Sequence, residues 1–276
     1  MTISANSLLV ASIQMTSSAS WHENLADAEK QIQAASEAGA KLIALPEYFC
    51  LMGHADHDKV KIQEEFNNGP MQDSLKEISQ KYGIYLIAGT LPLKSEYKNK
   101  VKNTTLVFNP NGETVARYDK IHLFGFKQGT EEYQESNSIE AGAEVCRFEI
   151  SQDGVSWEFG LSICYDLRFP ELYRTIGPVD CHIIPAAFTH TTGKAHWEVL
   201  LRARAIENQC YVLASAQSGK HENGRSTWGQ SMIIDPWGEI SSELKSGQGF
   251  ILGKLEKSVI QEIRSKLPAL QHRTLN

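Results

Sequence analysis

The stretch K-L-I-A-L-P, from Lys41 to Pro46, is an apolar run of strand length that ends at a proline. It lacks the polar alternation of a half-exposed strand, so it indicates a strand that is buried on both faces. The preceding residues 24–38 carry apolar side chains at helical spacing and end at Gly39, a common helix terminator. A helix followed closely by a buried strand is typical of a sheet that helices cover.

The same alternation continues in both directions along the chain. We predict buried strands at residues 8–13, 85–89, 160–164, 181–186 and 210–216, helices at 71–82 and 194–208, and hairpins at 105–117 and 230–241. Parallel strands mixed with hairpins predict an α/β fold, a four-layer α-β-β-α sandwich of two stacked mixed sheets with helices outside. We expect one domain over residues 1–276, and the pattern by itself leaves a doubly wound sheet open.

The composition argues against several classes of function. The 276 residues carry a net charge of −6, which disfavours nucleic acid as a partner. Residues 8–15 are apolar but short and lack a basic flank, so we expect neither a signal peptide nor a membrane span. The five cysteines are odd in number and scattered, which predicts reduced thiols in a cytoplasmic protein.

Three segments place a polar or reactive side chain directly after apolar residues. Glu47 follows the strand that Pro46 ends, Lys120 follows a hairpin strand, and Cys164 closes the predicted strand 160–164. Ligands of open α/β sheets bind at the carboxyl ends of the strands, so these side chains are candidates for one site. Taken singly, each has an ordinary interpretation: a surface glutamate, a lysine that reaches water, and a small core thiol.

The residues after Cys164 favour a reactive thiol. They form the polar turn Y-D-L-R, and a nucleophile on a sharp bend after a strand is exposed to substrate. The backbone N–H groups of such a turn, that of Tyr165 first, point at a developing oxyanion. We expect residues 169–175 to form a helix whose positive end lowers the pKa of the thiol.

Two nearby features have weaker claims. Cys50 is close to Glu47 in sequence but lies in a predicted loop without a strand-end turn. His54, His57 and Asp58 could suggest a metal site. The His-x-x-His spacing is nonspecific without a clear third ligand, so we interpret this segment as a polar loop. We expect neither a metal ion nor an organic cofactor.

Together the three segments resemble the nitrilase superfamily of carbon–nitrogen hydrolases, whose members share a Glu–Lys–Cys triad in this chain order. The matching motifs are L-P-E at Glu47, Y-D-K-I-H-L around Lys120 and C-Y-D-L-R-F-P-E from Cys164. The resemblance covers nearly the whole chain, from about residue 8 to 273. Residues 195–207 and the D-P-W-G of residues 235–238 are similar to the Nit branch, most of all to its Nit1-type deaminated glutathione amidases.

The resemblance implies thiol-dependent hydrolysis of a small amide to an acid plus ammonia. Cys164 is then the nucleophile and Glu47 its general base. Lys120 and the backbone N–H of Tyr165 stabilise the oxyanion, and the acyl group passes through a thioester on the cysteine. We expect burial to raise the pKa of Glu47, which a proton shuttle at neutral pH requires.

Family members carry a second glutamate after the lysine. In the Nit branch it lies in a segment like Y-Q-E-S, so we assign it to Glu135, with Glu131 and Glu132 as competing candidates. Its implied role is to position the substrate amide and to hold Lys120 by charge.

The substrate that the resemblance favours is deaminated glutathione, a 2-oxo acid amide. The substrate-binding residues that we expect are Arg168, Phe188, Thr189 and Thr192. Arg168 has the planar guanidinium that binds carboxylates with two hydrogen bonds. Its alternative role is a structural ion pair with Glu171 or Asp166.

Three alternatives stay open. The enzyme is an ω-amidase for 2-oxoglutaramate, it is another nitrilase-type amidase or carbamoylase, or the chain is a catalytically inactive interaction module. The resemblance also implies a homodimer or higher homo-oligomer, formed through residues 169–175 and 255–272.

Overall fold

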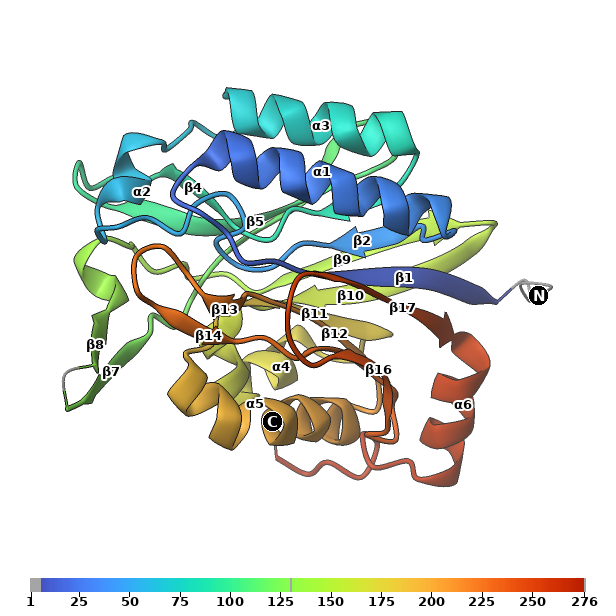
Figure 1. Ribbon diagram of the computed structural model, residues 1–276. Coiled ribbons are helices and arrows are strands. Elements are labelled where there is room, and N and C mark those ends of the chain that lie inside the picture. The colour runs from blue at the N-terminus through green and yellow to red at the C-terminus, as the bar shows by residue number, and fades with distance from the viewer. Residues whose placement is uncertain (1–5, 130, 276) are drawn as a thin grey trace.

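Two large sheets stack face to face in the centre of the molecule, and helices cover their outer faces (Figure 1). The computed structural model describes residues 6–129 and 131–275, without the side chain of Glu131. The helices on one side are α1 (Trp21–Glu37) and α3 (Pro70–Tyr82), and those on the other are α4 (Pro170–Ile176) and α5 (His190–Asn208). The predicted four-layer sandwich is therefore confirmed.

The first sheet has the strand order β17-β1-β2-β3-β5-β4, and β6 also pairs with β5. Its strands are β1 (Ser7–Gln14), β2 (Leu42–Ala44), β3 (Tyr85–Ile87), β4 (Leu91–Lys94), β5 (Val101–Phe108), β6 (Thr114–Asp119) and β17 (Gly249–Glu256). The β1-β2-β3 core is parallel, and the remaining pairs are antiparallel. The stretch around Lys41 is thus a central strand, which explains its unbroken apolar character.

The second sheet has the order β16-β15-β12-β11-β10-β9. Its strands are β9 (Cys146–Gln152), β10 (Val155–Leu161), β11 (Cys181–Ala186), β12 (Tyr211–Ala216), β15 (Ser231–Ile234) and β16 (Ile240–Leu244). Here too the centre, β10-β11-β12, is parallel. Both sheets therefore present carboxyl strand ends where ligands can bind.

The core divides into two apolar layers, and β1 contributes to both. Leu8 and Val10 belong to the cluster between the two sheets, whereas Ala11 and Ile13 pack in the cluster under α1 and α3. This is the two-residue period of a strand that is buried on both faces. Ser12 spans the two sheets, because its hydroxyl donates to the carbonyl of Ala214 at 2.8 Å.

Some ends of strands and helices differ from the prediction, at points where polar side chains follow apolar ones. β10 ends at Leu161, so Cys164 does not close the strand but follows it by three residues. Helix α5 begins at His190 rather than at residue 194, because the Thr189 side chain accepts the N–H of Thr192 as a helix cap.

Three strands of the large sheets, β4, β9 and β17, were not predicted. The other unpredicted helices and hairpins are α2 (Asp58–Lys61), α6 (Lys257–Lys266), the hairpin β7 (Gly125–Gln128) with β8 (Glu131–Gln134), and the hairpin β13 (Ser218–Lys220) with β14 (Ser226–Trp228). Figure 1 places α2 and both hairpins at the same end of the sandwich. No helix among the described residues is both long and apolar enough to cross a membrane.

Candidate active site

Glu47 lies just beyond the end of β2 and is buried, with 1% of its surface exposed. One carboxylate oxygen accepts hydrogen bonds from Asn103 Nδ2 at 3.0 Å and from Lys120 Nζ at 2.8 Å. The other accepts the backbone N–H of Ala187, just after β11, at 2.9 Å. Both sheets therefore fix the position of this carboxylate.

Lys120 follows β6 and is completely buried. Its ammonium donates to Glu47 Oε1 and to both oxygens of Glu135, at 2.9 and 2.8 Å. A buried ammonium is costly unless it is paired, and here two carboxylates pair with it. Burial opposes the charge, but Glu135 and Glu47 outweigh it and hold the pKa of Lys120 well above 10.5.

Glu135 is the glutamate that meets Lys120 from the side of the β7–β8 hairpin. It begins a 3₁₀ turn, η1 (Glu135–Asn137), directly after β8. Its carboxylate also accepts the Tyr48 hydroxyl and the N–H of Phe124, each at 2.7 Å. The competing Glu132 instead forms an exposed ion pair with a lysine of β7, and the side chain of Glu131 lies outside the described residues.

Cys164 begins a 3₁₀ turn, η2 (Cys164–Arg168), with a backbone φ of +49°. This left-handed conformation is unfavourable for a residue with a Cβ and persists only where the surroundings enforce it. The buried carboxylate of Asp166 supplies that constraint, because it accepts the N–H of Ile163 at 2.9 Å and the Tyr118 hydroxyl at 2.7 Å. The result is a sharp bend with the sulfur facing the cavity.

The expectation of a helix that lowers the thiol pKa is wrong. Helix α4 begins only at Pro170, after the turn, and the pKa of Cys164 lies well above 9.0. Burial is the largest cause and the Glu47 carboxylate the next, while Lys120 acts in the opposite direction. Burial thus disfavours the thiolate, and attack requires a base beside the thiol.

The pKa values of the two glutamates are displaced in opposite directions. Burial raises that of Glu47 above 4.5, as expected, against the lowering effect of Lys120 and of a hydrogen bond with the Cys164 thiol. For Glu135 the ammonium of Lys120 outweighs burial, and its pKa is lowered. Such a divergence between neighbouring acids separates a group that moves protons from one that stays charged.

Two cavities meet at Cys164. The larger contains about 590 Å³ of empty space, including its open mouth, and is lined by Glu47, Glu135 and Cys164 among others. The smaller contains about 210 Å³ of empty space, its open mouth included. Its lining includes Cys164 and the four predicted substrate-binding residues, Arg168, Phe188, Thr189 and Thr192. The structure thus brings all the predicted site residues to one place.

Arg168 does not form the ion pair that was its alternative role. Its guanidinium is within 3.2 Å of His196 Nδ1 and lies over the rings of Tyr165 and Phe188. In the described part of the chain it makes no ion pair with either Asp166 or Glu171. The cation is therefore available to a carboxylate in the smaller cavity.

Sequence analysis missed several groups that hold the site together. Asn103 and the N–H of Ala187 fix Glu47, Tyr48 holds Glu135, and Asp166 shapes the nucleophile turn. Asn103 carried a readable signal, since it is a buried amide within the strand β5. The backbone N–H of Ala187 gave none, because it acts only through tertiary position.

The two weaker candidates do not join the site. Cys50 is buried elsewhere; its thiol donates to the Thr90 carbonyl, and burial raises its pKa to about 12. Asp58 accepts hydrogen bonds from Lys61 and from the N–H of Ala55. Among the residues with described positions, no group of three or more His, Cys, Asp or Glu side chains could hold a metal ion.

Comparison with known proteins agrees with this geometry. The profile of the carbon–nitrogen hydrolase family matches residues 9–265. A deaminated glutathione amidase of Yersinia enterocolitica is 38% identical over 95% of this chain and 92% of its own length. One of Synechocystis sp. (strain PCC 6803 / GT-S) is 39% identical over 96% and 97%.

Among solved structures, the Caenorhabditis elegans NitFhit protein superposes with a TM-score of 0.89 at 34% identity, covering 99% of this chain and 66% of that one. The chain therefore belongs to the carbon–nitrogen hydrolase family. Its reaction class follows from the family and the site: it is an enzyme that hydrolyses amides with a thiol. Within the family, several relatives, including those of Yersinia enterocolitica, Synechocystis and Mus musculus, carry the name deaminated glutathione amidase.

Proposed function

We propose that the chain hydrolyses a 2-oxo acid amide, deaminated glutathione in the first place, with Cys164 as nucleophile. The observation that carries the proposal is the ammonium of Lys120 held between Glu47 and Glu135 in a cavity that Cys164 also lines. This arrangement supplies a base, a positive charge and a thiol within one water-restricted space.

In the first half of the reaction, Glu47 takes the proton of the Cys164 thiol as the sulfur attacks the amide carbon. The positive charge of Lys120 and the N–H of Tyr165 stabilise the oxyanion. When the tetrahedral intermediate collapses, the carbon–nitrogen bond breaks and Glu47 gives its proton to the departing nitrogen. The acyl group remains on the sulfur as a thioester.

In the second half, water replaces the amine beside Glu47. The carboxylate accepts one proton of that water, the hydroxide adds to the thioester carbon, and the thiol is restored by the proton on Glu47 as the acid leaves. Glu135 stays ionised throughout and keeps Lys120 charged. The leaving group depends on the amide: cysteinylglycine departs from deaminated glutathione, and ammonia departs only from a primary amide.

Arg168 supports the choice of a 2-oxo acid. The acyl part of the substrate remains attached to Cys164 and must fit one of the two cavities. The smaller cavity combines aromatic walls with the guanidinium of Arg168, which suits a short acyl chain that ends in a carboxylate.

A panel of amides tests the proposal. Deaminated glutathione, 2-oxoglutaramate, an N-carbamoyl amino acid and a nitrile are offered to the purified protein, and release of amine or ammonia is measured. We expect the highest kcat/KM with deaminated glutathione. Faster turnover of 2-oxoglutaramate would instead assign an ω-amidase, and no turnover of any of them, with Cys164 unmodified by iodoacetamide, would support an inactive interaction module.

A homodimer is the assembly that we propose. Helix α4 and the C-terminal segment, which belong to the two surfaces implied by the resemblance, adjoin one another in a surface hollow lined by Glu171, Arg174, His272 and Arg273. Sedimentation at micromolar concentration tests this, since a monomer there would contradict it. We also propose a cytoplasmic location, which cell fractionation tests; the five free cysteines support it.

A further inference from the structure

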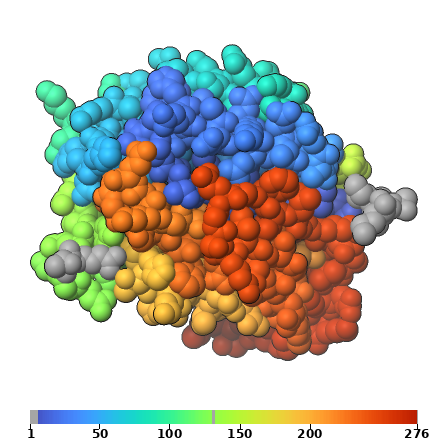
Figure 2. Space-filling model, in the orientation of Figure 1, coloured from blue at the N-terminus to red at the C-terminus, as the bar shows by residue number. Residues whose placement is uncertain are grey.

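The larger cavity extends beyond the catalytic groups to a positively charged rim that the mechanism above does not use. Its outer lining includes Asp56, Lys59, Arg225 and Ser226. These residues come from α2 and its preceding loop and from the β13–β14 hairpin. In the space-filling view, the orange segment around residues 220–228 abuts the light-blue segment around residues 50–60 (Figure 2).

The position of Glu47 indicates that the leaving group of a substrate binds in the larger cavity. Glu47 lines the larger cavity, together with Cys164, but it is not part of the lining of the smaller one. The general acid must reach the departing nitrogen, so the leaving group lies on the side of Glu47. The acyl group is then on the side of Arg168, and the two ends of the amide point to different cations.

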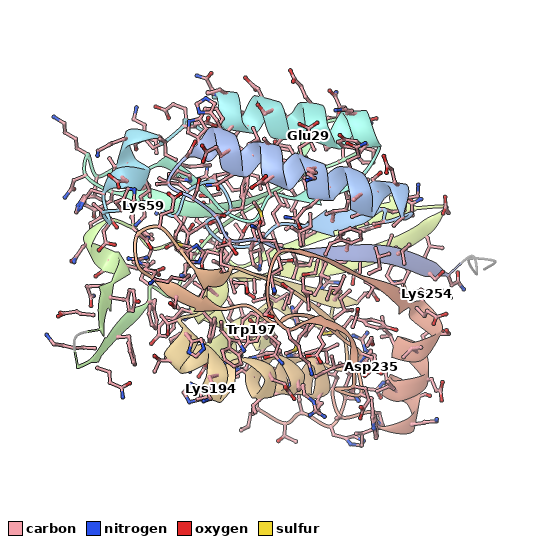
Figure 3. The ribbon with its side chains drawn as sticks, in the orientation of Figure 1. Glu29, Lys59, Lys194, Trp197, Asp235 and Lys254 are labelled. Carbon is pink, nitrogen blue, oxygen red and sulfur yellow. The ribbon has the colours of Figure 1, made fainter. Side chains whose placement is uncertain are left out.

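Lys59 is a cation with little to neutralise it. It lies on α2 (Figure 3) and lines the larger cavity. Its ammonium donates to Ser138 Oγ at 3.0 Å, and it forms no ion pair with any residue that the structure describes. Burial lowers its pKa, with Asp56 and Glu135 acting in the opposite direction.

Arg225 reinforces this charge from the facing hairpin. It pairs with Asp56 at 2.8 Å, and its guanidinium lies over the Tyr133 ring at 5.1 Å from the centroid. The pair with Asp56 uses only part of the five-donor guanidinium. At the rim, Lys59 and Arg225 thus place two cations beside the carboxylate of Asp56, and Glu135 also acts on Lys59 from the catalytic group.

We infer that Lys59 and Arg225 form a subsite for an anionic leaving group, one that carries a carboxylate several bonds from the departing nitrogen. This inference rests on the proposed function and deepens it. A substrate with a carboxylate at each end can place one carboxylate at Arg168 and the other at Lys59. Cysteinylglycine carries such a carboxylate, whereas the ammonia released from 2-oxoglutaramate has no group that could bind at Lys59 and Arg225. A further hollow, lined by Leu51, Gly53 and Ala55, also shares Lys59 and Arg225 and adjoins the rim.

Three amides with one acyl group test the subsite. They are deaminated glutathione, the same molecule with its C-terminal carboxylate converted to a primary amide, and 2-oxoglutaramate. We expect the wild-type enzyme to prefer the free carboxylate over its amide by about ten- to a hundredfold in kcat/KM, mostly through KM. Lys59→Met should bring that ratio close to one, and Lys59→Glu should bring it below one.

Two matched variants separate a subsite from a structural role. Lys61→Met removes an exposed lysine two residues further along α2 and should leave the ratio unchanged. Arg168→Met should lower kcat/KM for all three amides by a similar factor, because they share the acyl end. If Lys59→Met lowers all three equally, or if the wild-type ratio is near one, the subsite is wrong while the proposed amidase stands. A wild-type enzyme that cleaves none of the three would overturn the proposed function itself and this inference with it.

Discussion

Glu47 and Glu135 hold the same ammonium at nearly the same distance, 2.8 Å to the nearest oxygen, but their pKa values move apart. Glu135 receives Lys120 with both oxygens and also accepts the Phe124 N–H and the Tyr48 hydroxyl. Glu47 offers the lysine one oxygen and lies deeper, at 1% exposure.

The comparison shows how one cation can serve two carboxylates differently. On the strand-end side of the site, burial raises the pKa of Glu47, which suits the proton-shuttle role proposed for it. The hairpin side, with Glu135, is built so that its acid stays charged and keeps the lysine in place. Proton transfer should therefore depend on Glu47, and charge and position on Glu135.

Removal of the sulfur should have the largest effect. Cys164→Ala deletes the group on which both sides of the site act, so we expect kcat to fall by at least about 10⁴-fold with the fold retained. Steady-state kinetics and circular dichroism measure the two quantities. Cys146→Ala, which changes a half-buried cysteine outside both cavities, is the control and should keep its activity. Substantial turnover by Cys164→Ala contradicts the thioester mechanism.

The next effect distinguishes the two glutamates directly. Glu47→Gln removes the proton shuttle and should lower kcat by about 10²–10⁴-fold. Glu135→Gln retains hydrogen bonding around Lys120 and should cost less in kcat. A single-turnover experiment that follows acylation of Cys164 by mass spectrometry measures both. Equal losses of kcat in the two variants would contradict the different roles proposed for Glu47 and Glu135.

Loss of the shared cation should affect both activity and stability. Lys120→Met leaves two buried carboxylates without their partner, which should lower the free energy of unfolding by about 3–5 kcal/mol. Loss of the oxyanion charge should lower kcat by about 10²–10³-fold. Urea unfolding and initial rates measure these effects. The matched control Lys127→Met, at an exposed pair on the β7–β8 hairpin, should change little.

The smallest expected effect is on the pH dependence of stability. The raised pKa of Glu47 means that the folded protein holds this proton more tightly, so stability from Glu47 falls as pH rises from 4.5 through the folded-state pKa. The lowered pKa of Glu135 gives stability that is present above 4.5 and is lost as pH falls through its folded-state pKa.

Thermal unfolding from about pH 2 to pH 8, which spans both windows, therefore separates the two variants. Glu47→Gln should gain stability relative to wild type as pH rises, whereas Glu135→Gln should lose it. The same trend in both variants would show that the two carboxylates are equivalent, against the comparison above.

Local sequence predicted most of the fold because its signals are local. The buried strands around residues 41–46 and 181–186 are unbroken apolar runs, and Gly83 ends α3 in the left-handed conformation that glycine adopts freely. The helix α2 and the hairpin β13–β14 escaped prediction because they are short and lack an apolar face. These same elements carry Lys59 and Arg225, so the rim of the cavity was missed with them.

The sequence by itself determined the layered α/β architecture and singled out Glu47, Lys120 and Cys164, because apolar period, turn residues and motif order are written along the chain. Only the tertiary structure decided which glutamate meets the lysine, that burial raises the pKa of the Cys164 thiol, and that Arg168 and Lys59 line different cavities. Those properties depend on burial and on contacts between groups far apart in the chain, such as the hydrogen bond from the backbone N–H of Ala187 to the Glu47 carboxylate, 140 residues away. Charge interactions across such separations are set by packing, which no local pattern encodes.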